Sequence, residues 1–296
     1  MKASIFGANG YIGQHLAWYL HNEGWQIECF DIQEALIINV DIPYFQLNIN
    51  DKEKVKQLNY DCDYIFFFAG LTGTINSFDR YEDYVNVNEI GLLNILNLIK
   101  SLKKKPHIVF PSTRLVYKGK KDTPLSEDSV KEFKTIYAAS KYNGELYLDM
   151  YNNLYDINYT IFRICVPYGN IFSTTFSYGT IGFFLSRANK NLPIVLFGDG
   201  NLKRTFTYVI DICEQIINVI QNPASINQCF NVRGETFSLL EIANLIASKY
   251  DIEVQKVEWP VEALKLESGD TIFDSTKIEN LLNYKYDNSF SKWLTP

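Results

Sequence analysis

The sequence has little of the chemistry that binds metals or cross-links a chain. Its 296 residues include five cysteines and three histidines, and no two cysteines form a CxxC pair. An odd number of scattered cysteines argues against a disulfide framework and a zinc site, so we expect no metal and a cytoplasmic protein. Positive charge is also scarce. The 28 Lys and Arg against 34 Asp and Glu give a net charge of −6, which does not favour a nucleic-acid partner.

Long hydrophobic runs are absent too. No apolar stretch approaches the roughly 18 residues needed to cross a bilayer. The N-terminus passes from Met1 and Lys2 into a short apolar run and then glycines, without the long apolar segment of a signal peptide. We therefore expect no membrane partner. Hydrophobic residues nevertheless make up 47% of the chain, so a large core can form.

Short β-type runs alternate with helical patterns along the first half of the chain. The expected strands lie at 2–6, 26–30, 45–47, 64–69, 107–110 and 159–164, and the expected helices at 11–23, 51–58, 88–102 and 135–154. Parallel strands need crossover helices, so this alternation predicts an α/β fold with a Rossmann-like, doubly wound parallel sheet. We expect this domain at 1–165 and a smaller C-terminal lobe, mainly for substrate, at 166–296. Residues 204–221 are expected to return to the larger sheet.

A glycine-rich loop follows the first expected strand and opens the first helix. Gly7, Gly10 and Gly13 permit a tight turn and close backbone approach, and the helix N-terminus offers free N–H groups to a pyrophosphate. Asp31 follows the second strand, close to the ~20-residue spacing of the acid that bonds an adenosine ribose. It would repel a 2′-phosphate, which favours NAD over NADP. Each feature also has a plainer interpretation, as a turn and as a solvent-exposed loop aspartate.

Tyr137 and Lys141 are four residues apart on an expected helix, and therefore on one face of it. A neighbouring ammonium lowers the pKa of a phenol, which can then exchange a proton with a substrate alcohol or ketone. Tyr117 and Lys121 have the same spacing, but they cross a glycine-containing loop where this spacing guarantees no proximity. Position in the chain therefore favours Tyr137.

Two hydroxyl residues, Ser112 and Thr113, follow the expected strand at 107–110. They would lie at the carboxyl edge of the sheet, where doubly wound folds bind their ligands. A hydroxyl there could bond the substrate oxygen that Tyr137 serves. The alternative is a simple strand-end cap or a turn stabilised by a hydroxyl.

Taken in order, these motifs resemble the extended short-chain dehydrogenase/reductase family, in particular its branch of nucleotide-sugar epimerases, dehydratases and reductases. The likeness runs along nearly the whole chain. The matching segments are GANGYIG at 7–13, LNIND at 47–51, FAGL at 68–71, NEIG at 88–91, PSTRLVY at 111–117, YAASK at 137–141, RICVPYG at 163–169, FGDGNLKRTFTYVID at 197–211 and NVRGETFSL at 231–239.

The resemblance implies roles for individual residues. Tyr137 would be the acid/base, Lys141 its electrostatic partner and a ribose ligand, and Thr113 the hydroxyl beside the sugar O4. The residues implied to bind NAD are Gly7, Asn9, Gly10, Tyr11, Ile12, Gly13, Asp31, Ile32, Asn48, Ile49, Phe68, Ala69, Gly70, Thr72, Asn88, Tyr137, Lys141 and Cys165. Those implied to bind substrate are Thr113, Tyr137, Val166, Thr180, Arg204 and Asp270. Arg204 would pair with the nucleotide diphosphate, unless it is an ordinary surface arginine.

The chain also departs from the family pattern. Sugar-nucleotide 4,6-dehydratases carry Asp-Glu after the catalytic threonine, whereas this chain has Arg114-Leu115. The chain therefore lacks the acid that donates a proton when water is eliminated, which disfavours a dehydratase. Val166 replaces a frequent asparagine, and the usual Arg-Pro-Gly-Asp appears as Glu-Ser-Gly-Asp at 267–270.

Three functions remain open from the sequence. The first is a nucleotide-sugar 4-epimerase acting at C4 of an activated hexose, and the second is a 4-ketoreductase of a 4-keto-6-deoxy nucleotide sugar that consumes NAD(P)H. The third is a non-enzymatic dinucleotide-binding regulator. The resemblance further implies a homodimer formed through the helices near 88–102 and 135–154.

Overall fold

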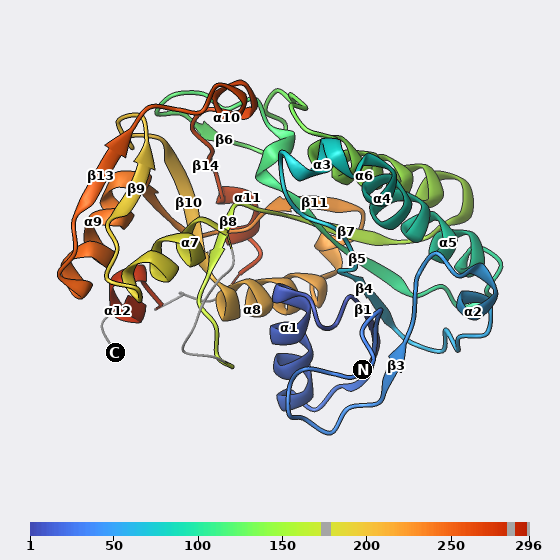
Figure 1. Ribbon diagram of the computed structural model, residues 1–296. Coiled ribbons are helices and arrows are strands. Elements are labelled where there is room, and N and C mark those ends of the chain that lie inside the picture. Colours follow the sequence, from blue (N-terminus) through green and yellow to red (C-terminus); the bar gives the residue numbers. More distant parts are fainter. Residues whose placement is uncertain (173–178, 283–287, 295–296) are drawn as a thin grey trace.

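The computed structural model describes residues 1–172, 179–282 and 288–294. Its larger part is a seven-stranded sheet with helices on both faces, and a smaller lobe lies beside the carboxyl ends of the strands (Figure 1). The strands of the large sheet are β1 (Lys2–Phe6), β2 (Gln26–Asp31), β3 (Tyr44–Gln46), β4 (Tyr64–Phe67), β5 (His107–Thr113), β7 (Tyr159–Ile164) and β11 (Gln228–Asn231). All neighbouring pairs are parallel, in the order β11-β7-β5-β4-β1-β2-β3. The doubly wound α/β fold predicted from the sequence is confirmed.

Two layers of helices cover this sheet. The helices are α1 (Tyr11–Asn22), α2 (Lys52–Lys56), α3 (Asn76–Asp79), α4 (Tyr81–Val85), α5 (Gly91–Ile99), α6 (Ile136–Tyr155) and α8 (Val209–Ile220). In Figure 1, α1 and α8 lie side by side on one face, and α4, α5 and α6 lie on the other. Between α4 and α5 the chain forms a turn of π-helix, η1 (Asn86–Ile90), so the helix expected at 88–102 begins earlier and is interrupted.

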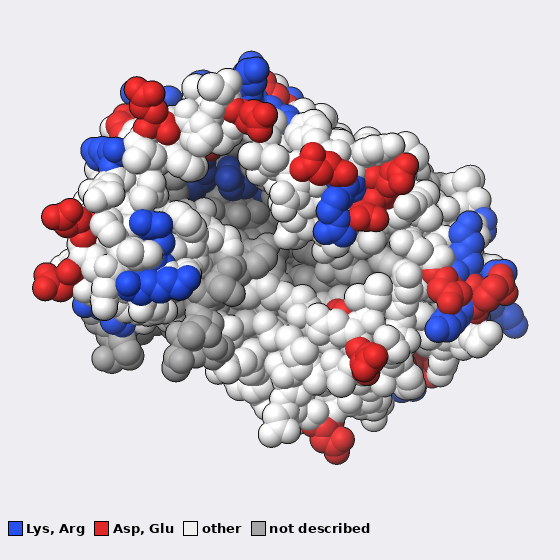
Figure 2. Space-filling model, in the orientation of Figure 1, with Lys and Arg blue, Asp and Glu red and all other residues white. Residues whose placement is uncertain are grey.

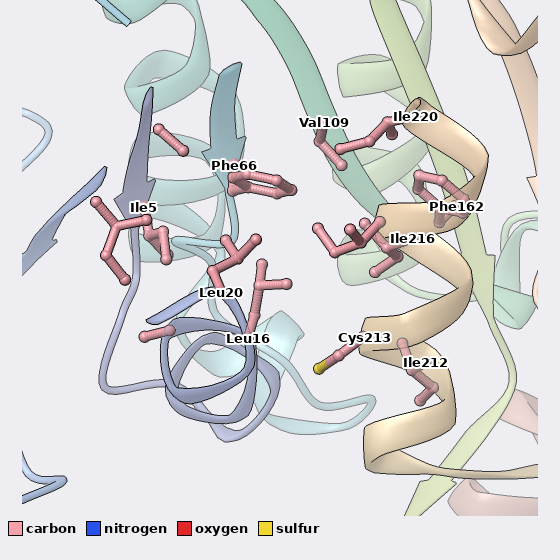
Figure 3. Close-up of a cluster of buried hydrophobic side chains, with 14 of the residues drawn as sticks. Ile5, Leu16, Leu20, Phe66, Val109, Phe162, Ile212, Cys213, Ile216 and Ile220 are labelled. Atoms are coloured by element: carbon pink, nitrogen blue, oxygen red, sulfur yellow. The ribbon is translucent and has the colours of Figure 1, made fainter. Parts of the chain in front are cut away.

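The core between α1, α8 and the sheet is apolar on every side. The side chains labelled in Figure 3 come from four of the strands and from both helices, and they point toward one another. The labelled residues are Ile5, Leu16, Leu20, Phe66, Val109, Phe162, Ile212, Cys213, Ile216 and Ile220. Burial of each large aliphatic or aromatic side chain contributes about 1.5–3 kcal/mol to folding. The central strands are buried on both faces, which explains why β4 is a continuous apolar run rather than an alternating one.

The smaller lobe has its own core and small sheets. β8 (Val166–Tyr168), β10 (Lys203–Tyr208) and β12 (Glu235–Ser238) form a three-stranded sheet, while β9 (Ile194–Phe197) pairs with β13 (Val254–Val257). A further short pair joins β6 (Pro124–Leu125) to β14 (Ile272–Phe273). The remaining helices are α7 (Gly179–Ala188), α9 (Leu239–Tyr250), α10 (Val261–Leu266), α11 (Thr276–Glu279) and α12 (Phe290–Leu294). No helix in the described ranges is both long enough and apolar enough to cross a membrane.

The return of the chain to the large sheet differs from the expectation for residues 204–221. The first half of that segment, β10, pairs with β8 and β12 in the small lobe. Its second half, α8, packs against α1 and the face of the large sheet. The strand that extends the sheet is β11, which pairs with β7. Its short sequence, QCFN, carries too weak a β pattern to be recognised without the structure.

Candidate functional site

The glycine loop lies where the strand order reverses, between β1 and its neighbours β2 and β4. Gly7 has φ +85°, and a Cβ there would overlap the backbone of Ala69 after β4. A Cβ on Gly13 would overlap the Gly7 carbonyl oxygen. The loop is held by the Gly7 and Ala8 amides, which both donate to the Phe30 carbonyl at 2.8 and 3.2 Å. Carboxyl ends of strands at such a reversal form a ligand crevice.

The N-terminus of α1 points its amides into this crevice. Gly10 is the N-cap residue, and no described side chain caps the helix. The first turn of the helix lies at the positive end of the helix dipole, which favours an anion there. The Tyr11 hydroxyl donates to the Gly169 carbonyl at 2.6 Å and so joins the loop to the segment after β8. This cradle fits the pyrophosphate of a dinucleotide.

Asp31 and Asn9 hold the loop that follows β2. The Asp31 carboxylate accepts from the Asn9 amide at 3.0 Å and from the Gln33 amide at 3.3 Å. The Asn9 side chain donates to the Ala35 carbonyl at 2.8 Å. Asn9 thus positions Asp31 and the loop through its own bonds, while the neighbouring Ile32 is exposed. The sequence of this loop contains no Lys or Arg that could receive a 2′-phosphate.

Asn88 holds the loop after β4, where Phe68, Ala69, Gly70 and Thr72 lie. Its side-chain oxygen accepts from the Leu71 amide at 2.7 Å, and its nitrogen donates to the Leu71 carbonyl at 3.1 Å and to Ser140 at 3.0 Å. The π turn η1 carries Asn88 inward, where it is buried. Asn88 thus acts on this loop rather than lining the crevice itself.

Asn48 and Ile49 follow β3. Asn48 is exposed, and its side chain accepts from the Asn50 amide at 3.0 Å. Ile49 is buried against Gly91, where a Cβ would overlap its side chain. Ile49 therefore fixes the end of β3 against α5, and Asn48 stays on the surface.

Three residues with proton-transfer chemistry meet at the end of β5 and the start of α6. Thr113 is the last residue of β5, which runs three residues beyond the expected strand. Thr135 caps α6 by accepting from the Ala138 amide at 3.0 Å, and Tyr137 and Lys141 follow in the first two turns. Burial lowers the pKa of Lys141 to about 7, opposed by the charge of Glu145. The Lys141 Nζ atom lies 4.1 Å from the centre of the Phe110 ring.

One cavity of about 530 Å³ brings many of the predicted residues together, a volume usual for small-molecule and cofactor sites. Those that line it are Gly10, Tyr11, Ile12, Gly13, Phe68, Gly70, Thr72, Thr113, Tyr137, Lys141, Cys165, Val166 and Thr180. Asp31, with Ile32, Asn9, Asn48 and Ile49, lies outside it on the β2 and β3 side. A second cavity, of about 400 Å³, opens at the amino ends of β1 and β2 and contains none of the predicted residues.

Arg204 and Asp270 are occupied by contacts within the protein. The Arg204 guanidinium is buried, pairs with Glu267 at 2.5 Å and donates to the carbonyls of Lys203 and Gly269. The two Asp270 oxygens accept from the backbone amides of Lys203 and Asp122 at 3.0 and 2.9 Å. A contact between Arg204 and the substrate diphosphate stays a prediction. It would require Arg204 to exchange its ion pair with Glu267 for one with the diphosphate.

Two features of the site were not among the predicted site residues. Arg114 lines the cavity directly beside Thr113. Glu145 follows Lys141 by one turn on α6. Its carboxylate pairs with the Arg163 guanidinium at 2.6 Å and accepts from the Ser112 hydroxyl at 2.5 Å. The spacing of Lys141 and Glu145, one helical turn, is a signal that could have pointed to Glu145. No spacing connects it to Arg163, which comes from β7.

Comparison with known proteins identifies the family. Residues 3–232 match the family model described as the NAD dependent epimerase/dehydratase family. The chain belongs to this family. The resemblance seen in the sequence is therefore confirmed, and so is NAD as the cofactor at the level of the family. In the described ranges, no group of three or more His, Cys, Asp or Glu residues could hold a metal ion.

Individual relatives in this family differ in their reactions. A putative UDP-glucose 4-epimerase of Methanocaldococcus jannaschii is 26% identical over 243 residues, covering 77% of this chain and 80% of the relative. A UDP-N-acetyl-alpha-D-glucosaminuronate decarboxylase of Bacillus cytotoxicus is 30% identical, over 79% of this chain and 75% of the relative. The solved structure of a Thermotoga maritima UDP-glucose 4-epimerase matches with a TM-score of 0.87 at 22% identity, covering 99% and 96% of the two chains.

Proposed function

We propose that this protein is an NAD-dependent 4-epimerase of a nucleotide-activated hexose. The observation that carries the proposal is the single cavity in which Thr113, Tyr137 and Lys141 face the glycine loop and the N-terminus of α1. The fold class and the family agree with it, and the M. jannaschii relative bears the name of such an epimerase.

Each catalytic side chain has one task in this reaction. NAD, when bound, supplies the reversible two-electron oxidation of C4. The Tyr137 phenolate takes the proton from O4 during oxidation, and the resulting phenol returns it after the sugar has presented its other face, so no proton is gained or lost overall. A positively charged Lys141 stabilises the Tyr137 phenolate. Thr113 holds O4 by a hydrogen bond, which keeps the reacting atoms aligned.

The cofactor is assigned to residues around the strand reversal. The pyrophosphate would sit at the N-terminus of α1 beside the glycine loop, and Asp31 would accept from the adenosine ribose. The loops carrying Phe68 and Thr72 would border the nicotinamide side. The negative charge of Asp31 and the lack of a nearby cation favour NAD over NADP.

A product assay tests the proposal. The NAD-saturated protein is incubated with UDP-glucose, and the C4 epimer is measured by NMR, with Tyr137→Phe as the control. Epimer formation without net NADH change supports the proposal. Net oxidation of NADH with a 4-keto-6-deoxy sugar nucleotide, and no epimer from any UDP-hexose or UDP-hexuronic acid, would identify a 4-ketoreductase instead. Retained NAD binding without any turnover would favour the non-enzymatic regulator.

We also propose a homodimer formed through α6 and α4, where α4 immediately precedes the segment at 88–102 that the sequence analysis expected in the interface. These helices pack beside each other on one face of the large sheet (Figure 1). Large apolar side chains on them are exposed, including Tyr81 and Val85 on α4 and Met150 and Leu154 on α6. A second copy covering this face would remove apolar surface from water.

A further inference from the structure

Arg114 is a cation that lines the cavity beside the proposed catalytic residues. It follows Thr113 directly, at the start of the short 3-10 turn η2 (Arg114–Val116), and the Thr113 hydroxyl caps this turn by accepting from the Leu115 amide at 3.3 Å. Its Nη1 atom donates to the hydroxyls of Ser268 at 3.1 Å and Thr271 at 3.4 Å. Both partners are neutral. Across the described ranges, no carboxylate forms an ion pair with Arg114, and its Nε and Nη2 atoms have no acceptor.

The neighbouring arginine is in the opposite situation. Arg204 is paired with Glu267, and Arg163 below the site is paired with Glu145. Burial and the charge of Arg204 lower the pKa of Arg114 to about 10, which still leaves it protonated at neutral pH. Figure 2 shows basic atoms recessed in the hollow between the two lobes. A partly buried, unpaired charge is costly, and an anionic ligand would offset that cost.

The chemistry of a hexose decides which anion lies nearest. Thr113 and Tyr137 bind O4 in the proposed reaction, and Arg114 lines the same cavity as these two residues. C6 is attached to C5, the ring neighbour of C4, whereas the diphosphate is attached to C1 on the far side of the ring. A guanidinium next to Thr113 and Tyr137 is therefore close to C6, the position nearest to O4 at which a hexose can carry an anion.

We propose that Arg114 binds a carboxylate at C6, so that the substrate is a nucleotide-activated hexuronic acid. This inference rests on the proposed function, because it takes O4 to lie at Thr113 and Tyr137. The Nε and Nη2 atoms of a guanidinium form a planar fork that matches the two oxygens of a carboxylate. Ser268 and Thr271 hold the opposite side of the same group, and so keep that fork turned away from the C-terminal segment.

Binding measurements test this assignment independently of turnover. Calorimetry on NAD-saturated Tyr137→Phe protein gives the Kd of UDP-glucuronate, UDP-glucose and UDP, with Arg114 intact or changed to Gln or Lys. We expect Arg114→Gln to raise the Kd of UDP-glucuronate about 10- to 100-fold, the usual effect of losing a charged hydrogen-bonding partner. UDP-glucose and UDP should change much less, and Arg114→Lys should keep part of the preference for the acid. Arg80→Gln, at an exposed arginine paired with Asp83, is the matched control and should change none of the three.

The outcomes separate this inference from the proposed function. If Arg114→Gln raises the Kd of all three ligands equally, Arg114 either binds the diphosphate or has a general structural role. That result would overturn the inference. The absence of any preference for UDP-glucuronate in the protein with intact Arg114 would overturn it as well. If the acid binds in an Arg114-dependent way but no C4 epimer forms with intact Tyr137, the proposed epimerase fails and the carboxylate site remains. If UDP-glucose is epimerised and Arg114→Gln leaves the Kd of UDP-glucuronate unchanged, only the proposed carboxylate site fails.

Discussion

Glu145 lies one helical turn after Lys141 on α6, and its charge opposes the loss of the Lys141 proton. The same carboxylate accepts from the Ser112 hydroxyl at 2.5 Å and from Arg163 Nε and Nη2 at 3.0 and 2.6 Å. Ser112 immediately precedes Thr113. Glu145 therefore connects the strand end that carries the catalytic hydroxyl to the helix that carries Tyr137 and Lys141, and it contributes to the electrostatics of both.

Glu145→Gln should shift the pH dependence of activity toward lower pH. Burial favours the neutral form of Lys141, and the Glu145 charge favours the protonated form, so removal of that charge lowers the Lys141 pKa below about 7. Activity that needs a charged Lys141 is then lost at a lower pH. The pH profile of kcat/KM measures this shift. Ser112→Ala retains the charge and should leave the profile in place.

The same variant should also lower stability. Arg163 would remain buried without its partner, a change that typically costs about 3–5 kcal/mol. Chemical denaturation gives the free energy of unfolding. A stable Glu145→Gln protein with an unshifted pH profile would contradict the role of Glu145 described above.

Tyr137→Phe should reduce kcat by about 10²–10⁴-fold, because the proton of O4 then has no acceptor. NAD binding should persist, since the assigned pyrophosphate cradle is made by the glycine loop. Stopped assays with the proposed substrate give kcat, and fluorescence titration gives the Kd of NAD. The control is Tyr147→Phe on the same helix, whose hydroxyl donates to Glu89 at 2.8 Å outside the cavity. Equal loss of activity in both variants would argue against a specific role for Tyr137.

Gly13→Ala should weaken NAD binding more than Gly10→Ala. A Cβ at Gly13 overlaps the Gly7 carbonyl, whereas at Gly10 the nearest atom of the protein, the Gly7 oxygen, is 3.1 Å away. Overpacking of this kind costs about 1–3 kcal/mol, which corresponds to at least a several-fold rise in Kd for Gly13→Ala. Titration with NAD measures both values, and a reversed order would contradict the cradle geometry.

Replacement of Met150 and Leu154 together by glutamate should convert the proposed dimer to a monomer. Their side chains are 57% and 71% exposed, so the single chain loses little packing, but charge would be buried in the interface. Light scattering after gel filtration gives the mass. Leu264→Glu, at a 55% exposed position on α10, is the control and should leave the mass unchanged. A wild-type monomer at micromolar concentration would rule out the interface.

Most helices and strands of the cofactor lobe could be predicted because the sequence signals for each lie within a short stretch of residues. β4 is a continuous apolar run, and α1 lies between the glycine loop and Gly24, so each signal lies within a short window. Thr113, Tyr137 and Lys141 were found the same way, through strand ends and helical spacing. The structure then places them around one cavity.

Contacts between distant segments could not be predicted in this manner. Arg204 pairs with Glu267, which lies far along the chain, and no periodicity relates the two. The substrate contact of Arg204 stays a prediction. The return through β11 was missed for a similar reason, since its four residues carry little pattern of their own. The domain limits proposed from the sequence and the cytoplasmic location stay predictions.

The path of the chain between the lobes restricts how the cavity can open. The backbone passes from one lobe to the other several times in the described ranges. The crossings include 164–166, 208–209 and 231–235, because α8 and β11 belong with the large sheet and β8, β10 and β12 with the small one. A lobe attached at a single point could rotate in any direction. Several attachments restrict the relative motion of the lobes to a rotation about a shared axis, and such a rotation would open or close the cavity between them.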